Sequence, residues 1–212
     1  MARAQEVDVE RAENPPPDPE TLIPSQRARR RRIVLAALHL LEERPYEKIQ
    51  MRDVADEAEV ALGTVYRYFA SKEHLFAAVL MEWSDMLQDR VQRRPLRGDT
   101  PGERLDDMMT RVLNSFERWP QFFGVVMQLE STPDVYAREE YSRFGQKTTA
   151  TWKEALAGLD SEDSDSIMTV MAAVLSSVVR SWTLGLIPMS EVRRRMTRSI
   201  DLIFSAPPPY DG

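Results

Sequence analysis

Helical periodicity interrupted by prolines is the feature that most limits how this chain can fold. Between residues 26 and 44 the apolar side chains follow an i, i+4, i+7, i+8 pattern, which is typical of an amphipathic helix. The proline at position 45 ends that helix because it lacks a backbone N–H. Similar patterns recur to the C-terminus, without convincing strand-like alternation. The predicted helices cover residues 26–44, 51–58, 62–68, 72–93, 101–118, 120–130, 133–157, 163–186 and 189–204.

This pattern predicts an all-α chain with a small N-terminal helical domain and a larger C-terminal one. Residues 1–24 are acidic and rich in proline, so we expect a disordered arm. Residues 25–75 are expected to form the N-terminal domain and residues 76–205 the C-terminal domain. Residues 206–212 are expected to form a flexible tail.

The composition excludes several kinds of functional site. The chain has 212 residues and no cysteine, which rules out disulfides, thiolate metal sites and a cysteine nucleophile. Its two histidines are too few for a usual catalytic zinc site, and His74 is expected at the surface. No apolar run approaches the roughly 20 residues of a membrane span, and the N-terminus lacks the apolar region of a secretory signal. We therefore expect a soluble cytoplasmic protein without a metal site, a cofactor or a membrane contact.

The distribution of charge is more informative than the net charge of −6. Residues 25–72 carry 10 basic and 7 acidic side chains, whereas the segments on either side are net acidic. A basic segment within an acidic chain is the electrostatic pattern of a local nucleic-acid contact. The N-terminal domain is therefore where a DNA-binding surface is expected.

The segment 51–68 has the spacing of a helix-turn-helix. The short helix at 51–58 is followed by only Glu59, Val60 and Ala61 before the next short helix at 62–68. Two short helices joined by a tight turn place the second helix where it fits the major groove of DNA. We therefore interpret residues 62–68 as a recognition helix.

The side chains on and around this helix suit contact with a duplex. With Val65 and Phe69 turned inward, the outer face carries hydroxyls for phosphate, an arginine for phosphate or guanine, and a glycine that permits close approach. Five arginines within residues 27–32 suit the DNA backbone or the minor groove. Taken singly, such tyrosines are often half-buried and such arginines often solvated, but their combination favours DNA binding. The predicted DNA-binding residues are Arg29, Arg30, Arg52, Leu62, Gly63, Thr64, Tyr66, Arg67, Tyr68 and Lys72.

The sequence QMRDVADEAEVALGTVYRYFASKEHLFAAVL, residues 50–80, resembles the DNA-binding domain of the TetR family of one-component regulators. The resemblance extends over residues 27–80 and implies a homodimer, a palindromic double-stranded DNA operator, and a C-terminal ligand cavity whose occupancy releases the DNA. It also implies that Arg52, Lys72 and the outer face of residues 62–68 contact DNA. Many members have a threonine near Met51 and a glycine near 44–45; the missing threonine affects a capping hydroxyl and not the fold.

Within that family, the segments QMRDVAD and VALGTVYRYFASKEHL look most like the actinobacterial repressors of cholesterol catabolism. That resemblance implies a small apolar effector, a coenzyme A thioester of a steroid or a long acyl chain. Methionines and aromatic residues are dense between residues 81 and 152, as in apolar ligand sites, although an ordinary core explains any one of them. The arginines between residues 90 and 97 would hold the coenzyme's phosphates, or would equally form a solvated loop. The predicted ligand-binding residues are Trp83, Met86, Met109, Phe116, Trp119, Phe123, Met127, Tyr141 and Phe144.

The two helices nearest the C-terminus have the features of a dimer interface. Apolar residues form a stripe on each helix, and small side chains permit close approach. Two such helices from each of two chains would form a four-helix interface, and an internal core is the alternative. The predicted interface residues are Ile167, Met171, Val174, Val178, Trp182, Met196 and Ile200.

These features predict a ligand-responsive transcriptional regulator, a repressor in the simplest case, and not an enzyme. The sequence contains no nucleophile elbow, phosphate loop or paired-histidine motif, so no catalytic residues are predicted. A ligand that favours a different separation of two recognition helices would lower the DNA affinity, with helix 72–93 as the link. Two other functions stay open: a regulator of efflux that responds to toxic hydrophobic compounds, and an all-α ligand carrier or cofactor-free enzyme.

Overall fold

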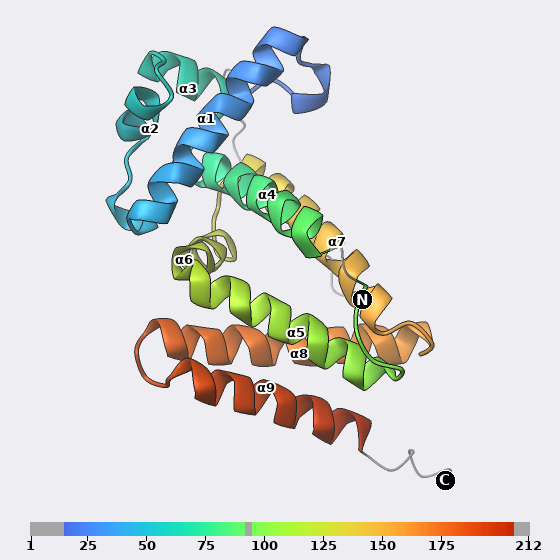
Figure 1. The fold of residues 1–212 in the computed structure, drawn as a ribbon. Helices are drawn as coiled ribbons and strands as arrows, with labels where there is room; N and C mark the ends of the chain where they lie inside the picture. The colour runs from blue at the N-terminus through green and yellow to red at the C-terminus, as the bar shows by residue number, and fades with distance from the viewer. Residues whose placement is uncertain (1–14, 92–94, 206–212) are drawn as a thin grey trace, which may run out of the picture. The chain divides into compact units, whose positions relative to one another are not determined.

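The computed structural model describes residues 15–91 and 95–205, and the regular structure within them is helical, apart from one isolated bridge between Ala157 and Leu159. Figure 1 shows the succession of helices along the chain. The all-α prediction is confirmed. The elements are η1 (Pro19–Thr21), α1 (Pro24–Glu43), η2 (Tyr46–Lys48), α2 (Met51–Glu57), α3 (Leu62–Tyr68), α4 (Lys72–Val91), α5 (Pro101–Arg118), α6 (Pro120–Leu129), α7 (Val135–Ala155), α8 (Ser161–Thr183) and α9 (Met189–Phe204).

The prolines delimit the helices in two different ways. Pro45 follows the end of α1, and Pro188 caps the start of α9. Pro101 and Pro120 are instead the first residues of α5 and α6. Proline is well tolerated there because the first N–H groups of a helix have no intrahelical partner. The predicted helices therefore agree closely with the observed ones, and α8 ends a little earlier than expected, at Thr183.

The predicted disorder of residues 1–24 is wrong for the part that the structure describes. Residues 19–21 form η1, and the side chain of Leu22 is buried. The Leu22 carbonyl accepts a hydrogen bond from the guanidinium of Arg27 at 3.2 Å, which ties this segment to α1. Residues 1–14, like the tail at 206–212, lie outside the described residues.

Contacts divide the chain into two compact units. The first contains the described residues up to Ser84 together with Val125–Arg143, and the second contains Asp85–Gly124 and the residues from Phe144 onward. This division differs from the linear border predicted between residues 75 and 76. The helices α4, α6 and α7 each contribute residues to both units.

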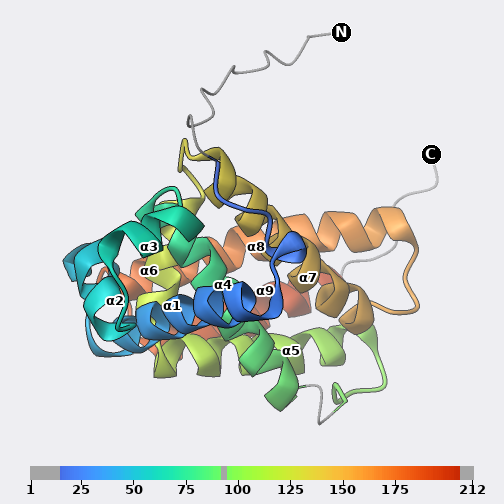
Figure 2. The ribbon, with the colours of Figure 1, turned by 90° about the horizontal axis from the view of Figure 1, so that it is seen from above.

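The first unit is built around α1 and the start of α4. Figures 1 and 2 both show α2 and α3 on the same side of α1. The buried side chains of α1 include Ile33 and Leu41, and every residue from Leu75 to Leu80 in α4 is buried. A helix segment that is apolar on all sides is covered on all sides, so this part of α4 is the centre of the unit.

The second unit has a core formed by α5, α8 and α9. The contacts between these helices are most extensive for α8 with α9 and for α5 with α9. Leu105, Met109 and Leu113 repeat at four-residue steps along α5 and are all buried, as expected for one face of a helix. The buried residues of α9 are Met189, Val192, Met196 and Ile200. The buried apolar residues of α8 are Met171, Val178 and Val179.

Candidate functional site

The turn between α2 and α3 sets the orientation of the recognition helix. Glu59 lies in the left-handed region with φ of 53°, a conformation that costs a residue with a side chain about 1 kcal/mol. The Glu59 N–H donates to the Asp56 carbonyl at 3.1 Å, and the Val60 N–H donates to the Ala55 carbonyl at 2.9 Å. The helix-turn-helix prediction is confirmed: α3 covers the expected residues, while α2 ends one residue earlier than expected, at Glu57, which makes the connection one residue longer.

The inner face of α3 is fixed by the core and its outer face is free. Val65 and Phe69 are fully buried, as predicted. Tyr66 is 51% exposed, and Gly63 and Arg67 are exposed beside it. Leu62 and Thr64 are half-buried, and the side chain of Arg52 at the start of α2 is exposed.

Gly63 makes no close contact with the described residues that would require a glycine. A Cβ atom built at this position meets no heavy atom within 4 Å. A glycine inside a helix destabilises it by about 1 kcal/mol relative to alanine, so a glycine that nothing in the chain requires needs another explanation. Close approach of a DNA backbone to α3 is such an explanation.

Two residues predicted on the outer face are engaged elsewhere. Tyr68 is 2% exposed, so its ring belongs to the core and the prediction that it lies at the edge of the DNA-binding face was wrong. Lys72 is half-buried, and its ammonium donates to the Tyr46 carbonyl at 2.6 Å while lying 3.9 Å from the centre of the Tyr46 ring. Burial lowers the pKa of Lys72, opposed by the nearby Glu73. The ammonium has three N–H donors and Lys72 is only half-buried, so its contact with phosphate stays a prediction.

The arginine-rich segment is helical and not an arm. All five of its arginines lie in the first turns of α1, where they cannot enter the minor groove as an extended strand. Arg31 forms an ion pair with Glu82 at 2.8 Å, and Arg30 is buried against Glu140. The assignment of Arg30 to DNA was therefore wrong for this structure. Arg29 and Arg32 are exposed and make no side-chain hydrogen bond or ion pair with the described residues, which leaves them available for phosphate.

The two histidines have opposite environments. His74 is 7% exposed, so the prediction of a surface position was wrong, and burial lowers its pKa to about 4. His39 lies on the exposed face of α1, where a hydrogen bond to Glu57 at 2.8 Å raises its pKa. No group of three or more His, Cys, Asp or Glu side chains that could hold a metal ion occurs in the part of the chain that the structure describes.

The predicted ligand-binding residues are divided between the two units. Trp83, Met127 and Tyr141 belong to the first unit, and the other predicted residues belong to the second. Within the second unit the rings of Phe116 and Phe123 meet edge to face with centres 5.5 Å apart. Trp83, Met109 and Phe123 are buried, Met86 is 36% exposed, and Phe116, Trp119, Met127, Tyr141 and Phe144 are half-buried.

That these residues line one effector cavity stays a prediction. Burial raises the pKa of Tyr141 to about 12, as expected for a phenol in apolar surroundings. Of the arginines predicted to hold phosphates, Arg93 and Arg94 and the side chain of Arg90 lie outside the described residues. The backbone N–H of Arg97 donates to Asp107 at 3.1 Å.

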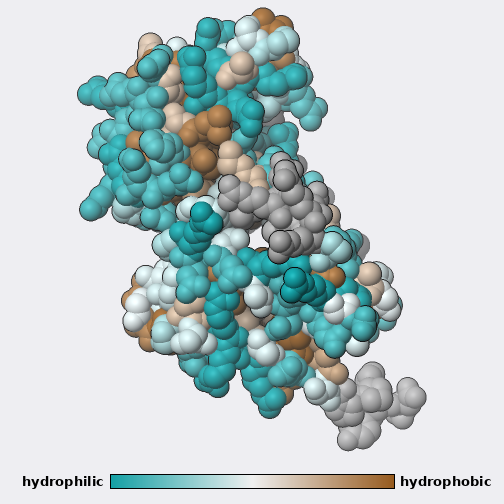
Figure 3. Space-filling view, viewed as in Figure 1, coloured by the Kyte–Doolittle hydropathy of each residue, from teal (hydrophilic) through white to brown (hydrophobic). Residues whose placement is uncertain are grey.

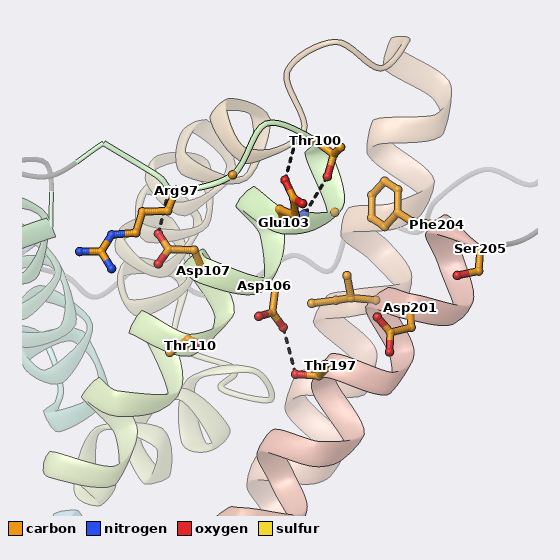
Figure 4. Close-up of a pocket in the computed structure, with 13 residues that line it drawn as sticks. Arg97, Thr100, Glu103, Asp106, Asp107, Thr110, Thr197, Asp201, Phe204 and Ser205 are labelled. Carbon is orange, nitrogen blue, oxygen red and sulfur yellow. Dashed lines mark hydrogen bonds between the residues drawn. The ribbon is translucent and has the colours of Figure 1, made fainter.

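A groove that the sequence did not predict lies between the start of α5 and the end of α9 (Figure 4). Its volume is about 590 Å³. The carboxylates of Glu103 and Asp106 line it but serve the fold: Glu103 caps α5 through the backbone N–H of Thr100 at 3.1 Å, and Asp106 accepts from the Thr197 hydroxyl at 3.0 Å. An acidic lining repels the phosphates of coenzyme A, so this groove does not suit the predicted effector.

The face of α8 that points away from the core is apolar and uncovered. Four of the seven residues predicted for the interface, Met171, Val178, Met196 and Ile200, are at most 5% exposed and pack inside one chain, so these four do not lie on that face. Val170 is instead 50% exposed. Ile167, Val174 and Trp182 are half-buried.

Exposed apolar side chains continue from α8 into the connection to α9. Leu184 is 66% exposed and Leu186 is 71% exposed. Figure 3 shows hydrophobic surface on the second unit at the end where α8 joins α9. By length and composition, α8 is also a candidate for a membrane span, which the sequence analysis did not anticipate. That test alone is weak, since a helix with an apolar face toward another protein satisfies it as well.

Family models match both parts of the chain. Residues 33–79 match the model of the bacterial regulatory proteins of the tetR family, and residues 98–203 match the model of the tetracyclin repressor-like C-terminal domain. The first match contains α2, α3 and the turn between them, and the second contains the core of α5, α8 and α9.

Curated relatives match over most of their length. The HTH-type transcriptional repressor KstR of Mycolicibacterium smegmatis is 31% identical over 180 residues, which are 84% of this chain and 88% of the relative. The repressor of the same name from Mycobacterium tuberculosis is 30% identical over 84% of this chain and 82% of its own.

Solved structures share the fold. A TetR transcriptional regulator from Rhodococcus sp. RHA1 superimposes with a TM-score of 0.74 at 24% identity, over 84% of this chain and 97% of that one. The regulator FadR from Bacillus subtilis, in complex with stearoyl-CoA, gives a TM-score of 0.61 at 18% identity, over 80% and 96%. With the helix-turn-helix geometry, the two family models and the KstR relatives in agreement, the chain belongs to the TetR family of bacterial transcriptional regulators.

Proposed function

We propose that this regulator is a repressor that binds a palindromic operator as a homodimer and leaves it when a coenzyme A thioester binds. Two observations together support the proposal. The face of α3 that would meet DNA is exposed, and the relatives are described as HTH-type transcriptional repressors. Arg52, Gly63, Tyr66 and Arg67 are the residues that we assign to the duplex.

The dimer is proposed to form through the outer faces of α8 and α9. Val170, Ala173 and Ser177 are exposed and repeat at steps of three and four residues, so they lie on one side of α8. Leu202 adds an apolar side chain on α9 that is 57% exposed. Small and apolar residues in this arrangement permit the close helix contact of a four-helix interface between two chains.

The effector is proposed to be a steroid or long-chain acyl group linked to coenzyme A. Two observations support this class: the relatives are the KstR repressors, and a structure of the same fold holds stearoyl-CoA. Apolar residues on α5, α6 and α7, such as Phe116, Phe123 and Phe144, would receive the acyl part. The acidic groove between α5 and α9 is not proposed as the site, because its carboxylates disfavour phosphate.

The test is a panel of compounds compared by thermal shift and by gel shift on operator DNA. Cholesterol-derived acids, their coenzyme A thioesters and fatty acyl thioesters are measured side by side with hydrophobic cationic drugs. A thioester effector should raise the melting temperature, because it binds the folded state, and should release the DNA. Release by the drugs alone, with no response to any thioester, would favour a regulator of efflux and end this proposal.

A further inference from the structure

A largely buried ion pair in the first unit joins α7 to α1, next to the helix-turn-helix. Arg30 of α1 donates to Glu140 of α7 at 3.3 Å, and the two side chains are 14% and 11% exposed. The guanidinium of Arg30 also lies 4.9 Å from the centre of the Phe69 ring, at the C-terminal end of α3. Glu140 therefore reaches the recognition helix through a single intervening side chain.

A second contact runs beside the ion pair. The His74 ring stacks on Tyr136 of α7 with centres 5.6 Å apart, and it also meets the Phe69 ring edge to face with centres 5.3 Å apart. His74 Nδ1 accepts the backbone N–H of Ala70 at 3.2 Å, so the neutral ring carries its hydrogen on the other nitrogen. A neutral His74 leaves Glu140 to pair with Arg30 and with Arg143, whose guanidinium is 3.1 Å from it.

This cluster is incompletely satisfied. The Nε atom of Arg30 and the hydroxyl of Tyr136 are buried and have no hydrogen-bond partner among the described residues. A buried polar atom without a partner destabilises the arrangement that contains it. Two such atoms, one from α1 and one from α7, make this contact less stable than one in which every polar atom is paired.

We propose that the Arg30–Glu140 ion pair and the His74–Tyr136 stack are positioning contacts through which α7 sets the orientation of the recognition helix. They form a connection to α3 that is additional to α4. Beyond Arg143, α7 continues into the second unit, where Phe144 is one of the predicted effector-binding residues. The inference needs DNA binding, and it does not depend on which effector the protein binds.

Two substitutions act on this arrangement in opposite directions. Glu140→Gln removes the charge that compensates Arg30 and weakens the observed arrangement. Tyr136→Phe keeps the stacked ring but removes the unpaired hydroxyl, which strengthens it. The two variants should therefore shift operator affinity in opposite directions, each by about tenfold, the usual size of a coupling between sites. The matched control is Glu82→Gln, which breaks the ion pair to Arg31, a side chain that is 64% exposed. That change should be nearly silent.

Fluorescence anisotropy with an operator duplex at 50 to 200 mM salt tests the proposal, with circular dichroism melting as the check on folding. A positioning role predicts that the salt dependence of both variants equals that of the wild type, since no phosphate contact is gained or lost. A change in the salt slope by about one would show that Arg30 itself meets phosphate, and would overturn the proposal. Shifts in the same direction, or affinities equal to the wild type, would overturn it as well.

If Glu140→Gln does not fold, Tyr136→Phe alone tests whether these contacts position the recognition helix. Altered operator affinity with an unaltered salt slope then supports the positioning role, and unaltered affinity contradicts it. A failure of the proposed repressor function is visible separately, because the wild-type chain itself would then not bind the duplex.

Discussion

The outer faces of α3 and α8 are both left exposed by the described residues, but the exposed side chains differ in chemistry. On α3 the exposed side consists of a glycine, a tyrosine and an arginine, and Gly63 has free space around it. On α8 the exposed side consists of small and apolar residues around Val170. A polar face with room for a close neighbour fits DNA, whereas an apolar face with small side chains fits another helix. Exposure alone identifies neither partner; the chemistry of the exposed atoms does.

The largest effect is expected when the apolar face of α8 is made charged. Val170→Arg would place two like charges, one from each chain, in a symmetric interface without partners, which costs several kcal/mol. Sedimentation should show a monomer, and the affinity for a palindromic operator should fall more than about a hundredfold. Ala172→Arg is the control, since Ala172 is also exposed but lies two residues along the helix from Val170, about 160° around it. An intact dimer with Val170→Arg would show that this face does not meet a second chain.

The two tyrosines of α3 distinguish its exposed, DNA-facing side from its buried side. Tyr68→Ala should lower the free energy of unfolding by about 3–5 kcal/mol, the usual effect of removing a buried aromatic ring. Tyr66→Ala should change it by no more than about 0.5 kcal/mol, because the ring is 51% exposed, while weakening DNA binding. Denaturant titration and anisotropy measure the two quantities. A reversed result, with Tyr66 stabilising and Tyr68 dispensable, would contradict the orientation of α3.

The buried His74 makes the first unit sensitive to acid. Its pKa of about 4 in the folded chain lies below the value of 6.5 of an unperturbed histidine, so the folded state favours the neutral ring. The stability that this provides is complete above pH 6.5 and is lost as the pH falls toward 4. The loss should be about 2 kcal/mol between pH 7.5 and pH 5.

Urea titrations at both pH values, on the wild type and on His74→Gln, measure this difference. The glutamine variant should lack this component of the acid loss. The contribution of His39 to stability depends on pH in the opposite direction, because its pKa is raised. That contribution is present at low pH and is lost as the pH rises. Equal acid sensitivity of His74→Gln and the wild type would assign the effect to other groups.

Gly63→Ala gives the smallest change in structure and the most selective change in function. Because nothing lies within 4 Å of the new methyl group, the fold should be unaffected or stabilised by about 1 kcal/mol. Operator affinity should nevertheless fall about tenfold, since the methyl group would occupy the space of the DNA backbone. Gly145→Ala, at an equally open position in α7, should leave DNA affinity unchanged. Unchanged DNA affinity in Gly63→Ala would place the duplex away from this part of α3.

The sequence predicted the helix-turn-helix well because its signals are local. The turn and the inward-facing Val65 and Phe69 lie within a few residues of one another. Once these two positions are known to face inward, helix geometry gives the residues of the outer face. Arg30 could not be placed in this way. Its partner Glu140 is 110 residues away, and no local pattern distinguishes an arginine that pairs inside the fold from one that meets phosphate.

The outward face of α8 could not be chosen from the sequence for a related reason. The helix is apolar on two sides, and its periodicity does not say which side the chain itself covers. In the structure α8 packs against α9, Met171 and Val178 are buried, and Val170 is 50% exposed. The groove between α5 and α9 was missed because its lining comes from two helices that are distant in the sequence.

We propose that one copy of this chain contacts only one half-site of the operator, and that two copies joined through α8 bind both half-sites. The most direct measurement is the mass of the protein–DNA complex by analytical ultracentrifugation, on a palindromic duplex selected from the genomic DNA of the source organism. The account predicts an even number of chains on the palindrome, and much weaker binding to a duplex with a single half-site. One chain bound to either duplex with equal affinity would contradict it.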